Sequence, residues 1–310
     1  PSKLDEVANG DIGSVLNTSL EMFAQQVKEA DGDKEIEKAY YDAKAENVRT
    51  LEAERGQIRD ILANLDIPAT MENIEAALNY VENSYNPLKE SYKRKDVLDS
   101  EKQTEFEELT DSMSEVLDSE ESIQEKCKQA EKYMEDILNR SYEQPDIRYE
   151  DLDSLRSLSK GINLSMLMAE RRSYDIPIKT GDTITNMNVT IIPSDDDNGK
   201  VKVSIRGNSS DEDNVLRLGD VTAEIKVVGE SVKGYVLAGE RQGYELLKES
   251  SDKLTKALET AGFEVKNISY GMNRVSQTDG FMAGKSDADT SALYKAAKII
   301  TAHLVSVSKQ

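Results

Sequence analysis

The spacing of hydrophobic residues changes near residue 173, and this change divides the chain into two regions. Before it, apolar side chains recur at steps of three and four residues, the spacing of one face of a helix. After it, apolar and polar side chains alternate, the spacing of a strand with one buried face. The pattern predicts an all-helical domain over residues 1–172 and an α+β domain over residues 173–310.

The first region contains helical segments separated by helix-breaking or helix-capping residues. In chain order, the expected segments are 11–29, 33–65, 71–83, a short helix from Asn86-Pro87, a helix led by Ser100 with Gln103 at capping-box spacing, a helix begun by Ser119, and one after Gln144-Pro145. The connections between these segments are short, and short connections favour antiparallel neighbours. The region is therefore predicted to be an antiparallel helical bundle.

The second region consists of strands interrupted by few helices. The expected elements are strands over 174–178, 183–192, 200–205, 221–228, 231–236 and 263–270, and helices over 241–261 and 290–307. The two-residue turn Gly229-Glu230 makes a β-hairpin of two of the strands, and Gly262 ends the longer helix. This order indicates an α+β fold with an antiparallel or mixed sheet, in which β-hairpins pack on one long helix.

Charge is distributed unevenly along the chain. The formal net charge is −21; residues 1–172 carry 40 acidic and 22 basic side chains, a net charge of −18, and residues 173–310 carry the remaining −3. A surface this acidic repels phosphate polymers and anionic membranes, and the longest basic run, residues 93–95, is flanked by Glu90 and Asp96. We therefore expect no nucleic-acid partner. No apolar stretch is long enough to span a bilayer, so no membrane insertion is expected either.

The catalytic chemistry available to the chain is narrow because it has one histidine, His303, and one cysteine, Cys127. Any Ser–His or multi-His site would have to include His303, which the pattern places as a packed residue of the last helix. Cys127 falls on an apolar helix stripe with acidic neighbours, whereas a reactive thiolate needs a positive surrounding. No metal-ligand spacing is present. The sequence therefore predicts a protein that is not an enzyme and that needs no cofactor or metal.

Two short segments resemble ligand-binding loops without matching them. The segment 280–286 has three residues between its first Gly and Gly-Lys-Ser, whereas a phosphate-binding loop has four and follows a strand directly. The acidic run 195–199 lacks the Glu at the twelfth position and the flanking helices of a calcium-binding EF-hand loop. The first is expected to be a linker and the second the tip of a hairpin.

One part of the second region resembles a known family. The residues that carry the resemblance are Leu218-Gly219-Asp220-Val221-Thr222-Ala223-Glu224-Ile225, Val232, Gly234-Tyr235-Val236, Leu246-Leu247, Leu254, Leu258, Gly262-Phe263, Val265 and Ile268. This order of a Leu-Gly turn, a hairpin, a leucine-rich helix, a glycine and a last strand is similar to the C-terminal domain of the flagellar hook-length control protein. The resemblance covers residues 215–272 and extends to 174–272 if the preceding hairpin is included. Val215 and Leu216 stand where the family usually has Pro-Glu.

The resemblance implies a function in protein export. It suggests a protein–protein interaction module that binds a component of the export apparatus, with the cytoplasmic domain of a flagellar export-gate protein as the candidate partner. The implied binding residues are Leu218, Gly219, Asp220 and Val221, at a strand whose edge we expect to be exposed and able to accept a peptide by strand addition. It also implies a bacterial, cytoplasmic protein, with export through a flagellar-type apparatus as a further possibility.

Three readings of the function remain open from the residues alone. The chain is either an export module or an acidic scaffold unrelated to flagella, whose helical region docks to a basic partner. A carboxylate-dependent hydrolase is a third reading, which the scarcity of aromatic side chains, 5% of the chain, disfavours for a sugar substrate. The chain starts at Pro1 without a methionine or an apolar signal segment, so we expect a piece of a longer protein without a cleaved signal.

Overall fold

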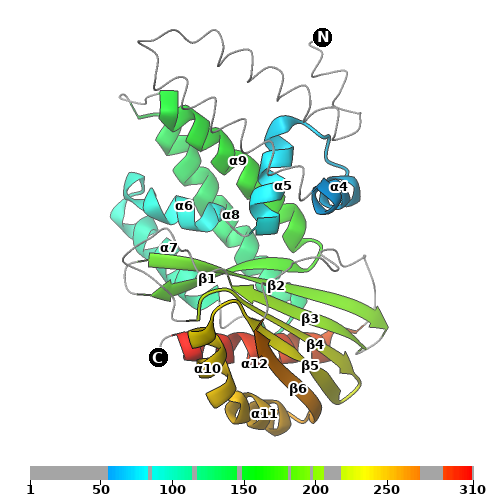
Figure 1. The fold of residues 1–310 in the computed structure, drawn as a ribbon. Coiled ribbons are helices and arrows are strands. Elements are labelled where there is room, and N and C mark those ends of the chain that lie inside the picture. Colours follow the sequence, from blue (N-terminus) through cyan, green and yellow to red (C-terminus); the bar gives the residue numbers. More distant parts are fainter. Residues whose placement is uncertain are drawn as a thin grey trace. The chain divides into compact units, whose positions relative to one another are not determined.

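The computed structural model describes residues 55–82, 86–113, 117–144, 149–180, 183–195, 198–205, 218–272 and 289–308 (Figure 1). The chain divides into two compact units, residues 1–82 and 83–310. The helix expected over 11–29 and most of the helix expected over 33–65 lie outside the described residues, and so does the segment 280–286. The predicted N-terminal bundle therefore stays a prediction.

In the first unit, two helices are described, α4 (Arg55–Asn64) and α5 (Met71–Glu82). Ile58 and Ile74 are fully buried, as their places on the apolar stripes predict. The break between the helices lies where Pro68 and Thr70 predict it. The Thr70 hydroxyl accepts a hydrogen bond from the backbone N–H of Asn73 at 3.3 Å, which caps the start of α5.

The second unit begins with helices. These are α6 (Pro87–Lys93), the short 3₁₀ helix η2 (Lys95–Val97), α7 (Ser100–Ser112), α8 (Glu120–Tyr142) and α9 (Tyr149–Ala169). Asn86 and Ser119 cap α6 and α8 as predicted. The helix α7 is present as predicted, but the predicted cap at Ser100 is wrong, because Asp99 is the capping residue and accepts a hydrogen bond from the backbone N–H of Lys102 at 3.1 Å. A carboxylate is favoured there because it interacts with the positive end of the helix dipole.

A six-stranded mixed sheet follows the helices and confirms the α+β character of the chain. Its strands are β1 (Ser173–Thr180), β2 (Thr183–Asp195), β3 (Asn198–Ile205), β4 (Val221–Val228), β5 (Ser231–Ala238) and β6 (Glu264–Met272). They are ordered β1-β2-β3-β4-β5-β6; β1–β5 are antiparallel neighbours, and β6 runs parallel to β5. The first strand begins at Ser173, where the hydrophobic spacing changes.

Three further helices pack on the sheet: α10 (Arg241–Glu249), α11 (Ser251–Thr260) and α12 (Ser291–Ser308). The single helix predicted over 241–261 is therefore two helices, and the prediction is wrong at Ser250. The Ser250 hydroxyl donates to the carbonyl oxygen of Leu247 at 3.1 Å, and such local bonding competes with regular helix geometry. Gly262 follows α11 with a φ of 93°, which favours glycine and ends the helical segment as predicted.

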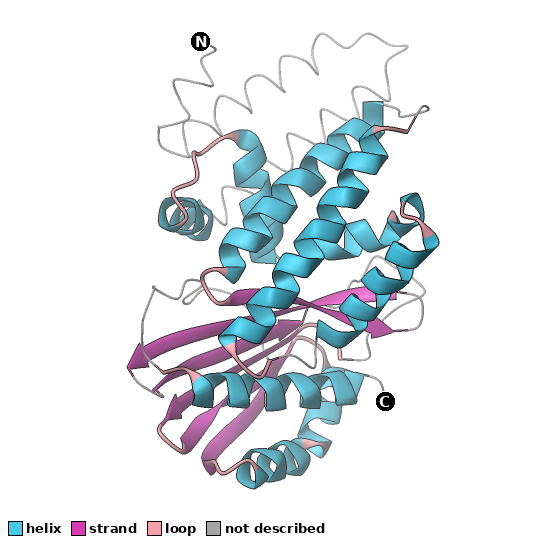
Figure 2. Cartoon of the chain, turned by 180° about the vertical axis from the view of Figure 1, so that it is seen from behind, coloured by secondary structure: helices cyan, strands magenta, loops and turns pink. Residues whose placement is uncertain are grey.

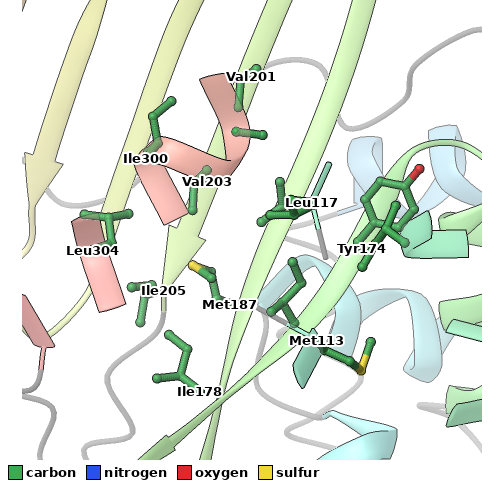
Figure 3. Close-up of a cluster of buried hydrophobic side chains, with 14 of the residues drawn as sticks. Met113, Leu117, Tyr174, Ile178, Met187, Val201, Val203, Ile205, Ile300 and Leu304 are labelled. Carbon is green, nitrogen blue, oxygen red and sulfur yellow. The ribbon is translucent and has the colours of Figure 1, made fainter. Parts of the chain in front are cut away.

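The two faces of the sheet differ in chemistry. One face is apolar and is covered by α12, which lies behind the strands in Figure 1 and in front of them in Figure 2. Figure 3 shows Val203 and Ile205 of β3 directed toward Ile300 and Leu304 of α12, and all four side chains are buried. The other face is polar, because the residues that alternate with this apolar set include asparagine, serine, threonine and lysine. We call these the apolar face and the polar face.

The helices α6–α9 belong to the same compact unit as the sheet. The Ser165 hydroxyl of α9 donates to Asp175 of β1 at 2.9 Å, and the guanidinium of Arg172 bonds the Glu120 carboxylate at 2.8 Å. The compact unit thus begins at residue 83, well before the boundary expected near residue 173. Whether residues 173–310 fold as a separate piece stays a prediction.

Candidate functional site

The turn over residues 218–221 is held by close contacts with the start of α10. Gly219 has a φ of 57°, and a Cβ there would lie 2.9 Å from Cδ of Glu240. A Cβ at Gly243 would lie 2.1 Å from the carbonyl oxygen of Leu218, so only glycine fits at this crossing. The Asp220 carbonyl accepts a hydrogen bond from the N–H of Gly239 at 2.8 Å. The turn and the helix therefore form one tightly packed unit.

The four predicted binding residues differ in accessibility. Leu218 and Val221 are fully buried and Gly219 is buried, whereas Asp220 is half-buried. Among these four, Asp220 is the residue whose side chain a partner can reach. Strand addition at Val221 is excluded, because Val221 pairs with Ile205 on one side and with Ala238 on the other. The expected exposed edge is wrong because β4 is an interior strand; the sheet order places β1 and β6 at the edges.

Sequence reasoning missed a buried polar network on the polar face. The Asp175 carboxylate accepts hydrogen bonds from the side-chain amides of Asn186 at 3.1 Å and Asn188 at 3.2 Å, besides the bond from Ser165. Thr190 donates to the Asn188 side-chain oxygen at 3.0 Å. The signal was visible in the sequence, because Asn186 and Asn188 alternate with Met187 and Val189 in an otherwise β-branched strand.

Asp175 also lines a small cavity under the helices. The cavity measures about 20 Å³, enough for about one water molecule, and Ser165 and Cys127 line it as well. Burial raises the pKa of the Asp175 carboxyl, which the three donated hydrogen bonds oppose. Burial, with the Asp175 charge as the next cause, raises the pKa of the Cys127 thiol to about 12. The thiol therefore stays protonated at neutral pH and is a weak nucleophile, as its apolar setting predicts.

The one histidine contacts a serine without the geometry of a nucleophilic pair. His303 is buried, and its Nε2 lies 3.2 Å from the Ser250 hydroxyl oxygen. The same hydroxyl lies 3.1 Å from the Leu247 carbonyl oxygen, which competes with the imidazole for its single proton. Burial, followed by the charge of Lys253, lowers the pKa of His303 to about 4. A base this weak would activate the hydroxyl poorly, so the pair joins α12 to the break between α10 and α11.

A surface groove of about 510 Å³ runs between α7 and α8. Glu105 and Glu108 line one wall, and Lys126 and Lys132 line the other. The Tyr133 hydroxyl donates to the Glu105 carboxylate at 2.6 Å, and this bond raises the pKa of Tyr133 to about 12. The groove therefore presents charges of both signs and favours neither an anion nor a cation.

Within the described ranges, no group of three or more histidine, cysteine, aspartate and glutamate side chains is arranged to hold a metal ion. Residues 196–197 of the acidic run lie outside those ranges. Among the helices that the structure describes, none combines the length and apolar character needed to cross a membrane. Comparisons of this chain with models of protein families, with curated proteins and with solved structures found no match.

Proposed function

We propose that the chain is a non-enzymatic protein–protein interaction module of the hook-length control type, which binds a component of a flagellar-type export apparatus. The observation that carries the proposal is the close crossing of the Leu218-Gly219 turn and Gly243 of α10. Leu218 and Gly219, which belong to the family resemblance, form one side of this crossing, and Gly243, which lies outside the residues of the resemblance, forms the other. The residues of the resemblance from Val221 onward lie in the unit from β4 to β6. That shared set of core positions supports a common architecture for the unit.

The order of elements also supports the proposal. The hairpin of β4 and β5 is followed by two helices and by β6, which lies parallel to β5. Most of the leucines quoted for the resemblance are buried where the helices meet the sheet; Leu247, Leu254 and Leu258 are at most 1% exposed. The cytoplasmic domain of an export-gate protein is the proposed partner. Residues 1–172 are proposed to form a bundle that precedes this module, in a bacterial protein of the cytoplasm.

The environments of His303 and Cys127, the two candidate catalytic side chains, support the proposal that the protein is not an enzyme. His303 is a weak base, and the Cys127 thiol is held protonated, for the reasons given above. The second candidate function, an acidic scaffold, rests on a different observation. Most of the negative charge lies in residues 1–172, which suits docking to a basic partner without any role for the 218–221 turn.

A pulldown separates the two functions. The cytoplasmic domain of the export-gate protein from the source organism is immobilised, and retention of the wild-type chain is compared with that of Asp220→Lys. Glu259→Lys is the matched control, because it makes the same change of charge at an exposed position of α11. We expect wild type and Glu259→Lys to be retained and Asp220→Lys to lose about fivefold in affinity or more. Absence of wild-type binding favours the scaffold, and equal binding by all three chains shows that Asp220 is not part of the contact.

A further inference from the structure

Three lysines lie side by side on the polar face of the sheet. Lys200 of β3 pairs directly with Lys226 of β4, and Lys226 pairs directly with Lys233 of β5. Residues paired in this way share a face, with Cβ atoms about 5 Å apart. All three side chains are exposed. The row therefore places three positive charges across about 10 Å of sheet, given the usual spacing of strands.

This row is unusual in a chain with a net charge of −21. Like charges directly opposite each other on neighbouring strands destabilise a sheet, so solubility alone is better served by mixed signs. The Lys200 ammonium forms an ion pair with the Glu224 carboxylate, with Nζ and Oε1 3.1 Å apart. Lys226 and Lys233 have no ion pair with any residue that the structure describes. Two of the three charges are thus available to a partner.

Exposed apolar side chains flank the lysines on the same face. Val228 follows Lys226 by two residues on β4 and is 49% exposed; Tyr235 follows Lys233 by two residues on β5 and is 37% exposed. They are two of the four large hydrophobic side chains exposed in the described part of the chain. Tyrosine beside cations is typical of protein interfaces, where apolar contacts supply affinity and charges supply orientation. We call Lys200, Lys226, Lys233, Val228 and Tyr235 the lysine patch.

The helix α12 covers the other face (Figure 3). On the polar face, α9 contacts β1 through Ser165 and Asp175, and the patch lies on β3–β5. The neighbours of the patch along β4 and β5, Val227 and Val232, are at most 1% exposed and point toward the helix layer. Two acidic side chains of strands β3–β6 lie near the patch. Glu224 is engaged by Lys200 and by the Tyr235 hydroxyl, which donates to it at 3.1 Å. Glu264 of β6, which pairs with Ser231 of β5, is engaged by the Ser231 hydroxyl and by Lys266. Asp196 and Asp197 lie outside the described residues.

We infer that the lysine patch is a docking surface for an acidic helix of a partner protein. Carboxylates spaced three and four residues apart on a helix are about 5–6 Å from each other, which matches the spacing of lysines on neighbouring strands. A helix lying across the strands would thus place one carboxylate over each lysine and an apolar side chain against Val228 or Tyr235. The inference rests on the proposed function and deepens it, because it adds the exposed face of β3–β5 to the partner contact proposed at the 218–221 turn.

The chemistry selects a polypeptide over the other polyanions. The patch is about 10 Å wide, which is close to the electrostatic screening length of about 8 Å at physiological salt. A short acidic helix fits within that width. A nucleic acid or an anionic membrane extends far beyond it and meets the negative charge of the rest of the chain.

The test is a titration of the full chain into a fluorescein-labelled, alanine-based helical peptide, followed by fluorescence anisotropy. The peptide carries Glu at positions i, i+4, i+7 and i+11, with a flanking Leu, so that the acids form one stripe. The variant is Lys226→Glu with Lys233→Glu. The matched control is Lys160→Glu with Lys256→Glu, which makes the same change of charge at two exposed helix positions.

We expect saturable wild-type binding that weakens at about 0.5 M salt, where the screening length is about 4 Å. The patch variant should bind about tenfold more weakly or worse, and the control within about twofold of wild type. Circular dichroism checks that each variant is folded, and Lys226→Gln with Lys233→Gln replaces the first variant if it is not. Equal binding by wild type and patch variant overturns the inference. Binding of an oligonucleotide or of anionic vesicles, but not of the peptide, overturns it too.

The peptide titration and the pulldown fail independently. A chain that binds the peptide through Lys226 and Lys233 but ignores the export-gate domain refutes the proposed function and leaves the docking surface in place. A chain that binds the gate domain equally well with and without these lysines refutes the docking surface and leaves the proposed function in place.

Discussion

The hydroxyl oxygens of Tyr174 and Tyr294 lie 2.6 Å apart in the protein interior. One tyrosine stands on β1 and the other on α12, and both are at most 1% exposed. Their ring centroids are 6.3 Å apart at an interplanar angle of 50°, within the range of favourable aromatic pairs. The pair connects the first strand of the sheet to the last helix of the chain.

Removing one hydroxyl of this pair should destabilise the fold. We expect Tyr174→Phe and Tyr294→Phe each to lower the free energy of unfolding by about 1–2 kcal/mol, because each leaves a buried hydroxyl without its partner. The double variant should cost less than the sum, because it removes both polar groups. Urea denaturation of the four chains measures the coupling. Strictly additive losses would contradict the structure.

Asp175 should make stability fall as pH rises through its folded-state pKa. Burial raises the pKa of its carboxyl, so below the ordinary value the proton is bound in both states. Between the ordinary and the raised pKa only the folded state holds the proton, and above both the buried charge is a net cost. Asp175→Asn should therefore stabilise the protein at pH 7 relative to wild type, and less so near about pH 3.

The control for Asp175→Asn is Asp175→Leu. The asparagine oxygen can still accept from Asn186 and Asn188, and its amide can donate to Ser165. Leucine leaves those three donors without an acceptor, so we expect a loss of about 2 kcal/mol or more in unfolding free energy at every pH. Equal unfolding free energies for Asp175→Asn and wild type at both pH values would contradict the predicted cost of the buried charge.

His303 should make the protein less stable in mild acid. Burial lowers the pKa of His303 from 6.5 to about 4, so the neutral ring favours the folded state. That stability is present above pH 6.5 and is lost as the pH falls through about 4, because the unfolded chain takes up the proton first. We expect His303→Gln to narrow the difference between urea midpoints at pH 7.5 and pH 4.5. A difference identical to that of wild type would show that His303 is not the group responsible.

Gly243 should not tolerate alanine. The added Cβ would lie 2.1 Å from the Leu218 carbonyl oxygen, and a backbone atom can move aside only if the turn shifts. We expect Gly243→Ala to cost about 2–3 kcal/mol, although alanine normally favours a helix. Gly229→Ala is the comparison; its Cβ meets nothing within 4 Å, and its φ of 56° costs about 1–2 kcal/mol. A higher thermal unfolding midpoint for Gly243→Ala than for wild type would refute the close approach of Gly243 to the Leu218 carbonyl oxygen.

Residues 83–310 should fold as one piece. The second compact unit spans this range, and contacts such as Ser165 to Asp175 and Lys179 to Asp111, at 3.3 Å, link its helices to β1. The change of period near residue 173 predicts instead that 173–310 folds alone. We expect cooperative urea unfolding of 83–310 and a broader, earlier transition for 173–310. Equal cooperativity and midpoint in both fragments would support the boundary at 173.

The local pattern of residues was sufficient to predict most of the described helices and strands, but it did not predict the break between α10 and α11. The start of β1 at Ser173, the cap at Ser119, the turn at Gly229 and the stop at Gly262 all follow from neighbouring residues, because periodicity, capping and turn geometry are short-range effects. The break at Ser250 was missed for the opposite reason. Its hydroxyl bonds both its own helix and His303, which is 53 residues away in the sequence.

The candidate sites depend on partners that only the tertiary structure brings together. The resemblance located the Leu218-Gly219 turn, but the interior place of β4 and the burial of Val221 follow from the strand order, which no local pattern encodes. The lysine patch has the same origin. Lys200, Lys226 and Lys233 look like scattered surface lysines in the sequence, and they form a row because strand register sets which residues stand opposite one another.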